Sequence, residues 1–140
     1  MTQLTGIIAL LLALLFSSDT KQPEDFKPLH VNGKVLLHDN GLRNAQIIVY
    51  SDNKKTAVHK TNAFGNFSFD LPLFKDYVLE ISYYDCIPVK VDFSTKLPEG
   101  EAKIGLFPFD FEPINLYLKI KGLDYSVFSE PVYKVYFNMD

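Results

Sequence analysis

Apolar and polar side chains alternate one by one along several short stretches of this chain. In the clearest of them, Phe67, Phe69 and Leu71 alternate with Ser68 and Asp70. A period of two puts the apolar side chains on one face of an extended strand and the polar side chains on the other. The glycine two residues before this stretch gives the backbone the freedom that a reversal needs. The pattern therefore predicts a half-buried strand entered through a tight turn.

The same alternation predicts seven further strands. They cover residues 31–37, 45–49, 56–61, 77–83, 87–93, 114–120 and 133–137. Polar, turn-forming residues separate the strands, most clearly at Asp39–Gly41 and Ser51–Lys55. No run of ten or more residues after Phe16 has the periodicity of a helix. Short strands in succession, divided by polar turns, are typical of a β-sandwich or a barrel.

Two segments interrupt the alternation and predict irregular structure. Leu97–Glu101 contains proline and glycine and is expected to be a loop. Ile104–Pro113 is rich in aromatic residues but is interrupted by Pro108, which favours an irregular or edge segment. Pro88 cannot donate a hydrogen bond within a sheet, so the strand at 87–93 should begin there or lie at a sheet edge.

Composition strengthens the expectation of β structure and limits the function. Twelve phenylalanines and eight tyrosines bring the aromatic content to 14% of 140 residues. Such rings favour pleated, half-buried surfaces. The formal net charge is −3, and the lysines and arginines are scattered along the chain. Because nucleic-acid binding needs a concentrated basic surface, a nucleic-acid partner is not expected.

The first eighteen residues predict an export segment. Leu4–Phe16 is uncharged and apolar, but as a helix it would span only about 20 Å of the roughly 30 Å core of a bilayer. Residues 1–18 are therefore expected to be a signal peptide, with an uncleaved N-terminal anchor and a buried first helix as the alternatives. Residues 19–28 are expected to form a solvated linker, and residues 29–140 the folded domain. A periplasmic or cell-envelope protein with no bilayer span after processing would result.

Four stretches resemble the carboxypeptidase regulatory-like family. They are Gly33–Val35, Leu42–Val49, Thr61–Phe67 and Tyr77–Ile81, within roughly Val31–Ser94. They are similar, in order, to the family's opening glycine-x-valine, its second strand, its central turn and the tyrosine-led strand that follows. Asn62 stands where the family more usually has aspartate. The chain departs from the pattern at Asp85 and Cys86, where the family often has Gly-Tyr.

This resemblance implies a transthyretin-like β-sandwich of seven or eight strands, with immunoglobulin-like, Greek-key connections. It also implies a standalone exported bacterial protein with an accessory role, as a spacer, a folding support or a binding surface. One enzyme class shares the fold, the hydroxyisourate hydrolases, which end in Tyr-Arg-Gly-Ser. This chain instead ends in Tyr136–Asp140, without Arg, Gly or Ser. A transthyretin-like hydrolase is therefore the least favoured function.

Histidine and cysteine residues form no recognisable catalytic or metal-binding pattern. His30 and His38 lie eight residues apart on one expected strand, about 26 Å in extended chain, which is too far for one metal ion. Both are expected in solvent at the ends of that strand, and His59 could join either only through the tertiary fold. Cys86, the only cysteine, is expected to be buried as a small hydrophobic residue. The polar turns could hold calcium if the fold brought them together, although turn chemistry alone explains their residues.

The sequence predicts one possible binding site, an aromatic surface. Phe107 and Phe109 belong to a segment in which phenylalanines alternate with proline and aspartate, and Tyr117 follows on the next strand. Such rings can present an apolar surface to a sugar or to a partner protein. The alternative is a structural role in the core, which we favour because alternation puts the phenylalanines on one face.

These observations predict a non-catalytic, exported β-sandwich of the cell envelope that acts through contacts with another envelope protein. The alternative is a carbohydrate- or small-ligand-binding module that uses Phe107, Phe109 and Tyr117. No catalytic, cofactor-binding or metal-binding residue is predicted, and no cofactor is expected.

Overall fold

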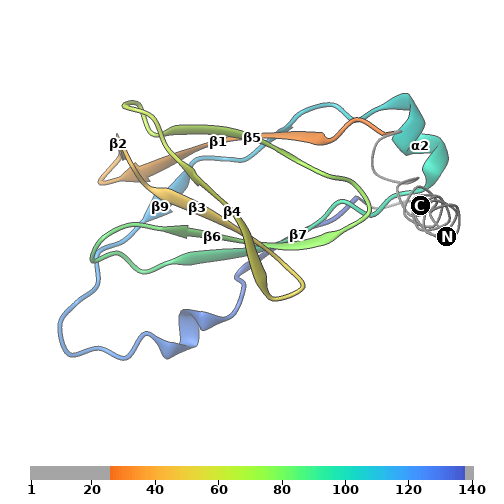
Figure 1. Ribbon diagram of the computed structural model, residues 1–140. Coiled ribbons are helices and arrows are strands. Elements are labelled where there is room, and N and C mark those ends of the chain that lie inside the picture. The colour runs from red at the N-terminus through yellow and green to blue at the C-terminus, as the bar shows by residue number, and fades with distance from the viewer. Residues whose placement is uncertain (1–25, 138–140) are drawn as a thin grey trace, which may run out of the picture.

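The computed structural model describes residues 26–137 and shows two β-sheets packed face to face (Figure 1). The first sheet contains β1 (Leu29–Leu37), β2 (Asn40–Gly41), β5 (Asn66–Leu71), β8 (Phe109–Asp110) and β9 (Ile114–Leu116). The second has the order β10 (Tyr133–Val135), β7 (Val89–Ser94), β6 (Asp76–Ser82), β3 (Gln46–Ser51) and β4 (Lys54–Lys60). A short helix, α2 (Glu99–Ile104), and a 3₁₀-helix, η1 (Ser126–Ser129), complete the elements. The predicted all-β sandwich is confirmed, while its transthyretin-like topology stays a prediction.

The expected signal peptide or anchor, residues 1–18, lies outside the described residues, as does the linker up to residue 25. The end of that linker contacts the domain, because the Phe26 ring packs edge-on against Phe74 with 5.0 Å between the ring centroids. In the part of the chain from 26 to 137, no helix is long and apolar enough to cross a bilayer.

Strand pairing makes β1 the centre of the first sheet. It pairs antiparallel with β5 along one edge and parallel with β8 and β9 along the other. In the second sheet, β6 lies between β3 and β7 and is antiparallel to both, whereas β10 runs parallel to β7. The chain crosses between the sheets five times, once after each of β2, β4, β5, β7 and β9. The C-terminal third of the domain thus adds parallel strands to both sheets.

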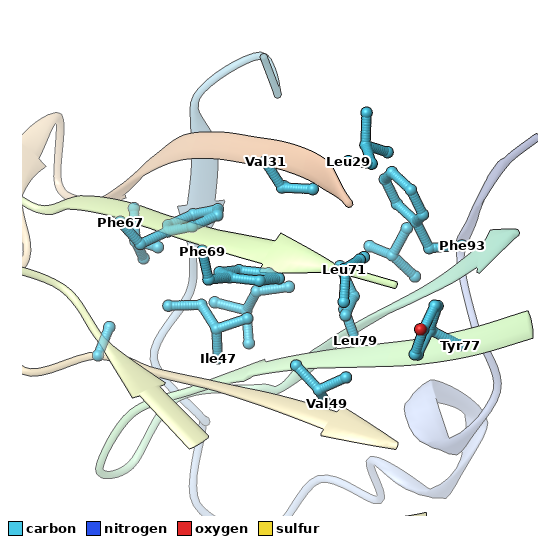
Figure 2. Packing of buried hydrophobic residues seen from close by; sticks show 14 of the residues in the cluster. Leu29, Val31, Ile47, Val49, Phe67, Phe69, Leu71, Tyr77, Leu79 and Phe93 are labelled. Atoms are coloured by element: carbon cyan, nitrogen blue, oxygen red, sulfur yellow. The ribbon is translucent and has the colours of Figure 1, made fainter. Parts of the chain in front are cut away.

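The core lies between the sheets and consists of the side chains that the alternation singles out. Phe67, Phe69 and Leu71 of β5 face Ile47 and Leu79 of the second sheet (Figure 2). All five are buried, and burying a side chain of this size contributes about 1.5–3 kcal/mol. Alternation is therefore the main reason why these residues form strands of a two-layer structure.

Buried polar groups are paired. The Ala45 N–H donates to Thr61 Oγ1 at 2.9 Å, and the Thr61 hydroxyl donates to the Leu42 carbonyl. At the other end of the sandwich, the Thr95 hydroxyl donates to the Pro72 carbonyl at 2.8 Å. Among the described residues, no buried side-chain nitrogen or oxygen lacks a partner, which avoids the cost of about 1–3 kcal/mol for each orphaned group.

The first turn lies two residues earlier than the Asn-Gly signal predicts. The residues in the left-handed region are His38 (φ 52°) and Asp39 (φ 64°). Asn40 and Gly41 instead form β2, which pairs with Leu36 and Leu37 of β1. The predicted turn is present, but it is centred on His38-Asp39 and not on Asn40-Gly41.

Two other local predictions are wrong in extent. The expected loop at 97–101 leads into helix α2, which buries Ala102 against the core. The expected strand at 114–120 ends at Leu116, because its partner β1 ends at Leu37, directly opposite. Beyond that point Ile120 is 65% exposed, although its place in the alternation predicts a buried side chain. The irregular segment around Pro108 and the strand that begins after Pro88 are as predicted.

Candidate functional site

A pocket of about 420 Å³ opens between the C-terminal strands of the two sheets. Val91 of β7 and Val135 of β10 line one side, and Phe109, Phe111 and Ile114 line the other. The parallel pairing of β10 with β7 and of β9 with β1 places these walls opposite each other. We call this pocket, with Tyr117 and Tyr133 that also line it, the aromatic groove. Its volume and apolar lining are typical of sites that bind small molecules or single side chains.

The structure brings together two of the three residues of the predicted binding surface. Phe109 and Tyr117 both line the aromatic groove. Phe107 does not line it and is 94% exposed in the connection between α2 and β8. The prediction that alternation puts the phenylalanines on one face is wrong for Phe107, because residues 105–108 are not a strand.

Phe109 and Phe111 have a structural role as well as a place in the groove. Their ring centroids lie 5.2 and 5.8 Å from that of Phe93, which is buried. The two rings also pack edge-on against each other at 4.9 Å. Edge-to-face pairs of this kind add about 0.5–1.5 kcal/mol to the burial of the rings. The floor of the groove is therefore fixed by the core.

Most of the residues that line the groove could not be assigned to it from the sequence. Tyr133 and Val135 belong to a predicted strand, but the parallel pairing of β10 with β7 is what places Tyr133 opposite Val91 and Val135 opposite Phe93. No local pattern encodes which strand β10 will join. Phe111 and Ile114 belong to segments that the sequence predicts, and only the pairing of β9 with β1 shows that they face this opening.

The segment after the groove exposes many apolar side chains. Exposed apolar residues between β9 and the C-terminal end of the described chain are Tyr117, Leu118, Ile120, Leu123, Val127, Phe128, Val132, Tyr133 and Tyr136. The segment extends away from the sandwich before it returns as β10 (Figure 1). It is held by a few hydrogen bonds, including Lys90 Nζ to the Ser129 carbonyl at 2.9 Å. A concentration of exposed apolar side chains is typical of an interaction surface.

The three histidines lie apart, as the sequence predicts. His30 and His38 are both exposed, and His59 stacks on Phe69 with 4.4 Å between the ring centroids. His30 is not free in solvent, however, because its Nδ1 lies 2.7 Å from Asp70 Oδ1 and its Nε2 lies 2.8 Å from Ser68 Oγ. Within residues 26–137 no three His, Cys, Asp or Glu side chains are grouped to hold a metal ion.

Cys86 is buried, which confirms the prediction for this residue. Burial raises the pKa of its thiol, the charge of Asp85 raises it further, and Lys119 partly opposes them. The thiol therefore stays protonated and unreactive at neutral pH.

The two polar turns lie at opposite ends of β3. The turn at His38 and Asp39 is on the side where the chain enters β3, and the turn at Asp52 and Asn53 follows its last residue. Six residues of strand span about 20 Å. The turns are too far apart to share one calcium ion.

Comparison with known proteins identifies no family. Neither a protein-family model nor a curated protein matches the sequence. A solved structure with a distant likeness to this chain is catechol 1,2-dioxygenase from Acinetobacter sp. ADP1, inhibited by bound mercury, at 13% sequence identity and a TM-score of 0.48. The match covers 84% of this chain and 60% of the dioxygenase chain, so this chain spans about three fifths of that enzyme. The expectation that the chain is not an enzyme is contradicted by this match to an enzyme and is withdrawn, although so distant a likeness assigns no activity.

Proposed function

We propose that this chain is an exported accessory β-sandwich of the cell envelope, and that it holds a partner protein through its aromatic groove. The observation that supports the proposal most directly is the groove itself, an apolar pocket of about 420 Å³ with Tyr117 and Tyr133 exposed beside it. Tyrosine is enriched at protein interfaces because its ring buries a large apolar area while its hydroxyl keeps a polar partner.

The surroundings of the groove favour a protein partner. The exposed apolar segment of residues 117–136 continues the apolar surface beyond the pocket. Asp110, Glu112 and Lys134 also line the groove and supply charges of both signs. An apolar centre with polar groups around it is the usual arrangement of an interface.

Two sequence features support the other parts of the proposal. The resemblance of Val31–Ser94 to carboxypeptidase regulatory-like domains supports the accessory role, because such domains usually accompany a catalytic or transport protein. The apolar stretch Leu4–Phe16 supports export.

The groove is tested by recovery of a partner from the envelope fraction of the native cells. Purified Tyr133→Ala and Tyr117→Ala variants should each recover a specific partner at least about tenfold less well than the unmodified chain, since a central aromatic contact contributes about 2 kcal/mol or more. Phe64→Ala is the matched control, because Phe64 is 71% exposed and does not line the groove. Equal recovery by all four proteins would exclude the groove as the docking site.

Export is tested separately by cell fractionation and intact-mass analysis of the natively expressed protein. A mature chain that starts near Asp19 in the envelope fraction is the expected result. Full-length protein in the cytosol would overturn the proposed location but would not bear on the proposal that the groove binds a partner.

The volume of the groove also favours a second function, the binding of a small apolar ligand or a sugar. Stacking of a sugar ring on Phe109 or Tyr117 would use the same walls. A glycan and small-molecule screen by thermal shift tests this function. A hit whose stabilisation is lost in Phe109→Leu and Tyr117→Ala would support it, and binding unchanged in both variants would exclude it.

A further inference from the structure

The outward face of the first sheet carries a hydrogen-bonded serine, histidine and aspartate. His30 Nδ1 lies 2.7 Å from Asp70 Oδ1, and His30 Nε2 lies 2.8 Å from Ser68 Oγ. The two nitrogens of one imidazole thus contact a carboxylate on one side and a hydroxyl on the other. This is the order of contacts in the serine–histidine–aspartate arrangement of hydrolases, which is recognised by geometry and not by sequence position.

The strand register explains why these side chains meet. His30 is directly opposite Asp70 in the β1–β5 pair, and Asn32 is directly opposite Ser68. Residues two apart share a face, so His30 lies diagonally beside Ser68, within the reach of an imidazole ring. A His-x-Asn stretch on β1 and a Ser-x-Asp stretch on β5 are therefore sufficient to build the arrangement.

We propose that Ser68, His30 and Asp70 hydrolyse carboxylic esters that reach this open face. Ser68 Oγ would attack the ester carbonyl carbon while its proton passes to His30 Nε2. The carbon–oxygen bond to the alcohol then breaks, and the alcohol leaves with the proton from His30. Water, deprotonated in turn by His30, adds to the acyl carbon. The bond from that carbon to Ser68 Oγ then breaks and Oγ takes the proton back from His30, so the net reaction is ester plus water to acid plus alcohol.

Each side chain has a distinct role. Asp70 accepts a hydrogen bond from Nδ1–H, which leaves Nε2 as the free base that faces Ser68. Asp70 is thus a positioning residue, because it acts through His30. The Ser68 hydroxyl also lies 2.9 Å from Asn32 Oδ1, and Asn32 Nδ2 donates to Asp110 at 3.0 Å. Because Ser68 has one hydrogen, it must rotate from Asn32 to His30 before the attack.

The solvent exposure of these three side chains determines which esters can reach them and how much they can accelerate hydrolysis. The side chains of His30 and Asp70 are 47% and 57% exposed, so an ester that projects from a larger molecule can approach as readily as a small one. The next cross-strand pair on this face is Lys34 and Asn66, and both of these side chains carry N–H groups. At so open a site, general-base assistance should supply most of the acceleration, about 10²-fold to 10⁴-fold.

The test uses the full chain with 4-nitrophenyl acetate as substrate and a 4-nitrophenyl phosphonate ester as covalent probe. Ser68→Ala is expected to lower kcat/KM by about 10²-fold or more and to abolish the probe adduct, which peptide mass analysis should place on Ser68. Ser94→Ala is the matched control, since Ser94 donates to Asp76 at 2.7 Å on the other sheet. It should react like the unmodified chain.

Positioning by Asp70 has its own readout. Asp70→Asn is expected to lower kcat with little change in KM, and Asp70→Glu should restore part of the rate. An Asp70→Asn variant with unchanged kcat would remove Asp70 from the mechanism. If Ser68→Ala retains the wild-type rate, or if the probe leaves Ser68 unmodified, the three side chains are a polar cross-strand ladder and the proposal is wrong. Thermal unfolding of each variant checks that the fold is intact.

Discussion

Tyr77 shows how burial of one side chain sets the chemistry of its polar group. Its ring is buried in the core, and its hydroxyl donates to the Pro72 carbonyl at 2.8 Å. Burial raises the pKa of Tyr77 to about 12, because the phenolate would lose its hydration. In the unfolded chain the pKa of tyrosine is about 10. Between these values the unfolded state releases the proton first, so the contribution of Tyr77 to stability is complete below pH 10 and is lost as the pH rises towards 12.

Replacement of Tyr77 by phenylalanine should make the free energy of unfolding less sensitive to alkaline pH. Between about pH 10 and 12, the free energy of unfolding of the unmodified chain should fall more steeply than that of Tyr77→Phe, by about 1.4 kcal/mol per pH unit. At pH 8 the variant should be less stable by about 0.5–1.5 kcal/mol, because the bond to Pro72 is lost. Urea unfolding at a series of pH values measures both effects.

The comparison isolates Tyr77 from the other tyrosines. Burial also raises the pKa of Tyr50, with the charge of Glu80 adding to the effect, but both proteins retain Tyr50. Parallel pH dependences for the two proteins would show that the phenol of Tyr77 titrates alike in the folded and unfolded states.

At the scale of elements, Gly41 is needed for close packing and not for the turn that it follows. A Cβ atom at this position would lie 2.1 Å from the carbonyl oxygen of Phe64. Phe64 belongs to the turn that leads into β5, so Gly41 allows the β1–β2 hairpin to approach that turn. The neighbouring backbone cannot move aside as a flexible side chain would.

Gly41→Ala should therefore destabilise the domain by about 1–3 kcal/mol, the usual cost of overpacking. Gly100→Ala is the matched control, because a Cβ at Gly100 in α2 meets nothing within 4 Å. Alanine is favoured over glycine in a helix by up to about 1 kcal/mol, so the control should be neutral or more stable. Thermal and urea unfolding distinguish the two, and equal stability of both variants would contradict the close-approach argument.

The strands could be predicted from the sequence, but their lengths and partners could not. Alternation reports which residues share a face, as Phe67, Phe69 and Leu71 show. It does not show where a partner strand ends, so it predicts a strand from Ile114 to Ile120, although the pairing of β9 with β1 ends at Leu37.

The candidate sites follow the same division. Phe109 and Tyr117 can be predicted as binding residues from the aromatic residues in their segments of the sequence. Tyr133 lines the groove only because β10 pairs in parallel with β7. The contact of His30 with Ser68 and Asp70 likewise depends on the register of β1 and β5, which join residues about forty positions apart. The alternation within one strand excludes a slip by one residue, but it does not choose among registers that differ by two residues.

At the scale of the whole molecule, Phe93 contacts both sheets and the C-terminal segment, and among the described residues no strand pairing joins the two sheets across the core. It lies on β7 of the second sheet and is buried. Its ring contacts Phe109 of the first sheet and Phe111 in the connection that follows β8, and its centroid lies 6.5 Å from that of Phe137 near the end of the described chain. The two sheets and the C-terminal segment therefore share one cluster of rings and should unfold together.

Phe93→Ala should destabilise the whole sandwich by about 3–5 kcal/mol, because it removes a buried ring and leaves a cavity among the other three. Phe107→Ala, in which the replaced ring is 94% exposed, should change stability by no more than about 0.5 kcal/mol. Urea unfolding followed by far-ultraviolet circular dichroism and by tyrosine fluorescence should give one coincident transition for each variant. Separate transitions in Phe93→Ala would mean that the C-terminal segment, which carries most of the exposed tyrosines, unfolds independently of the sandwich. The aromatic groove would then lose one wall before the core melts.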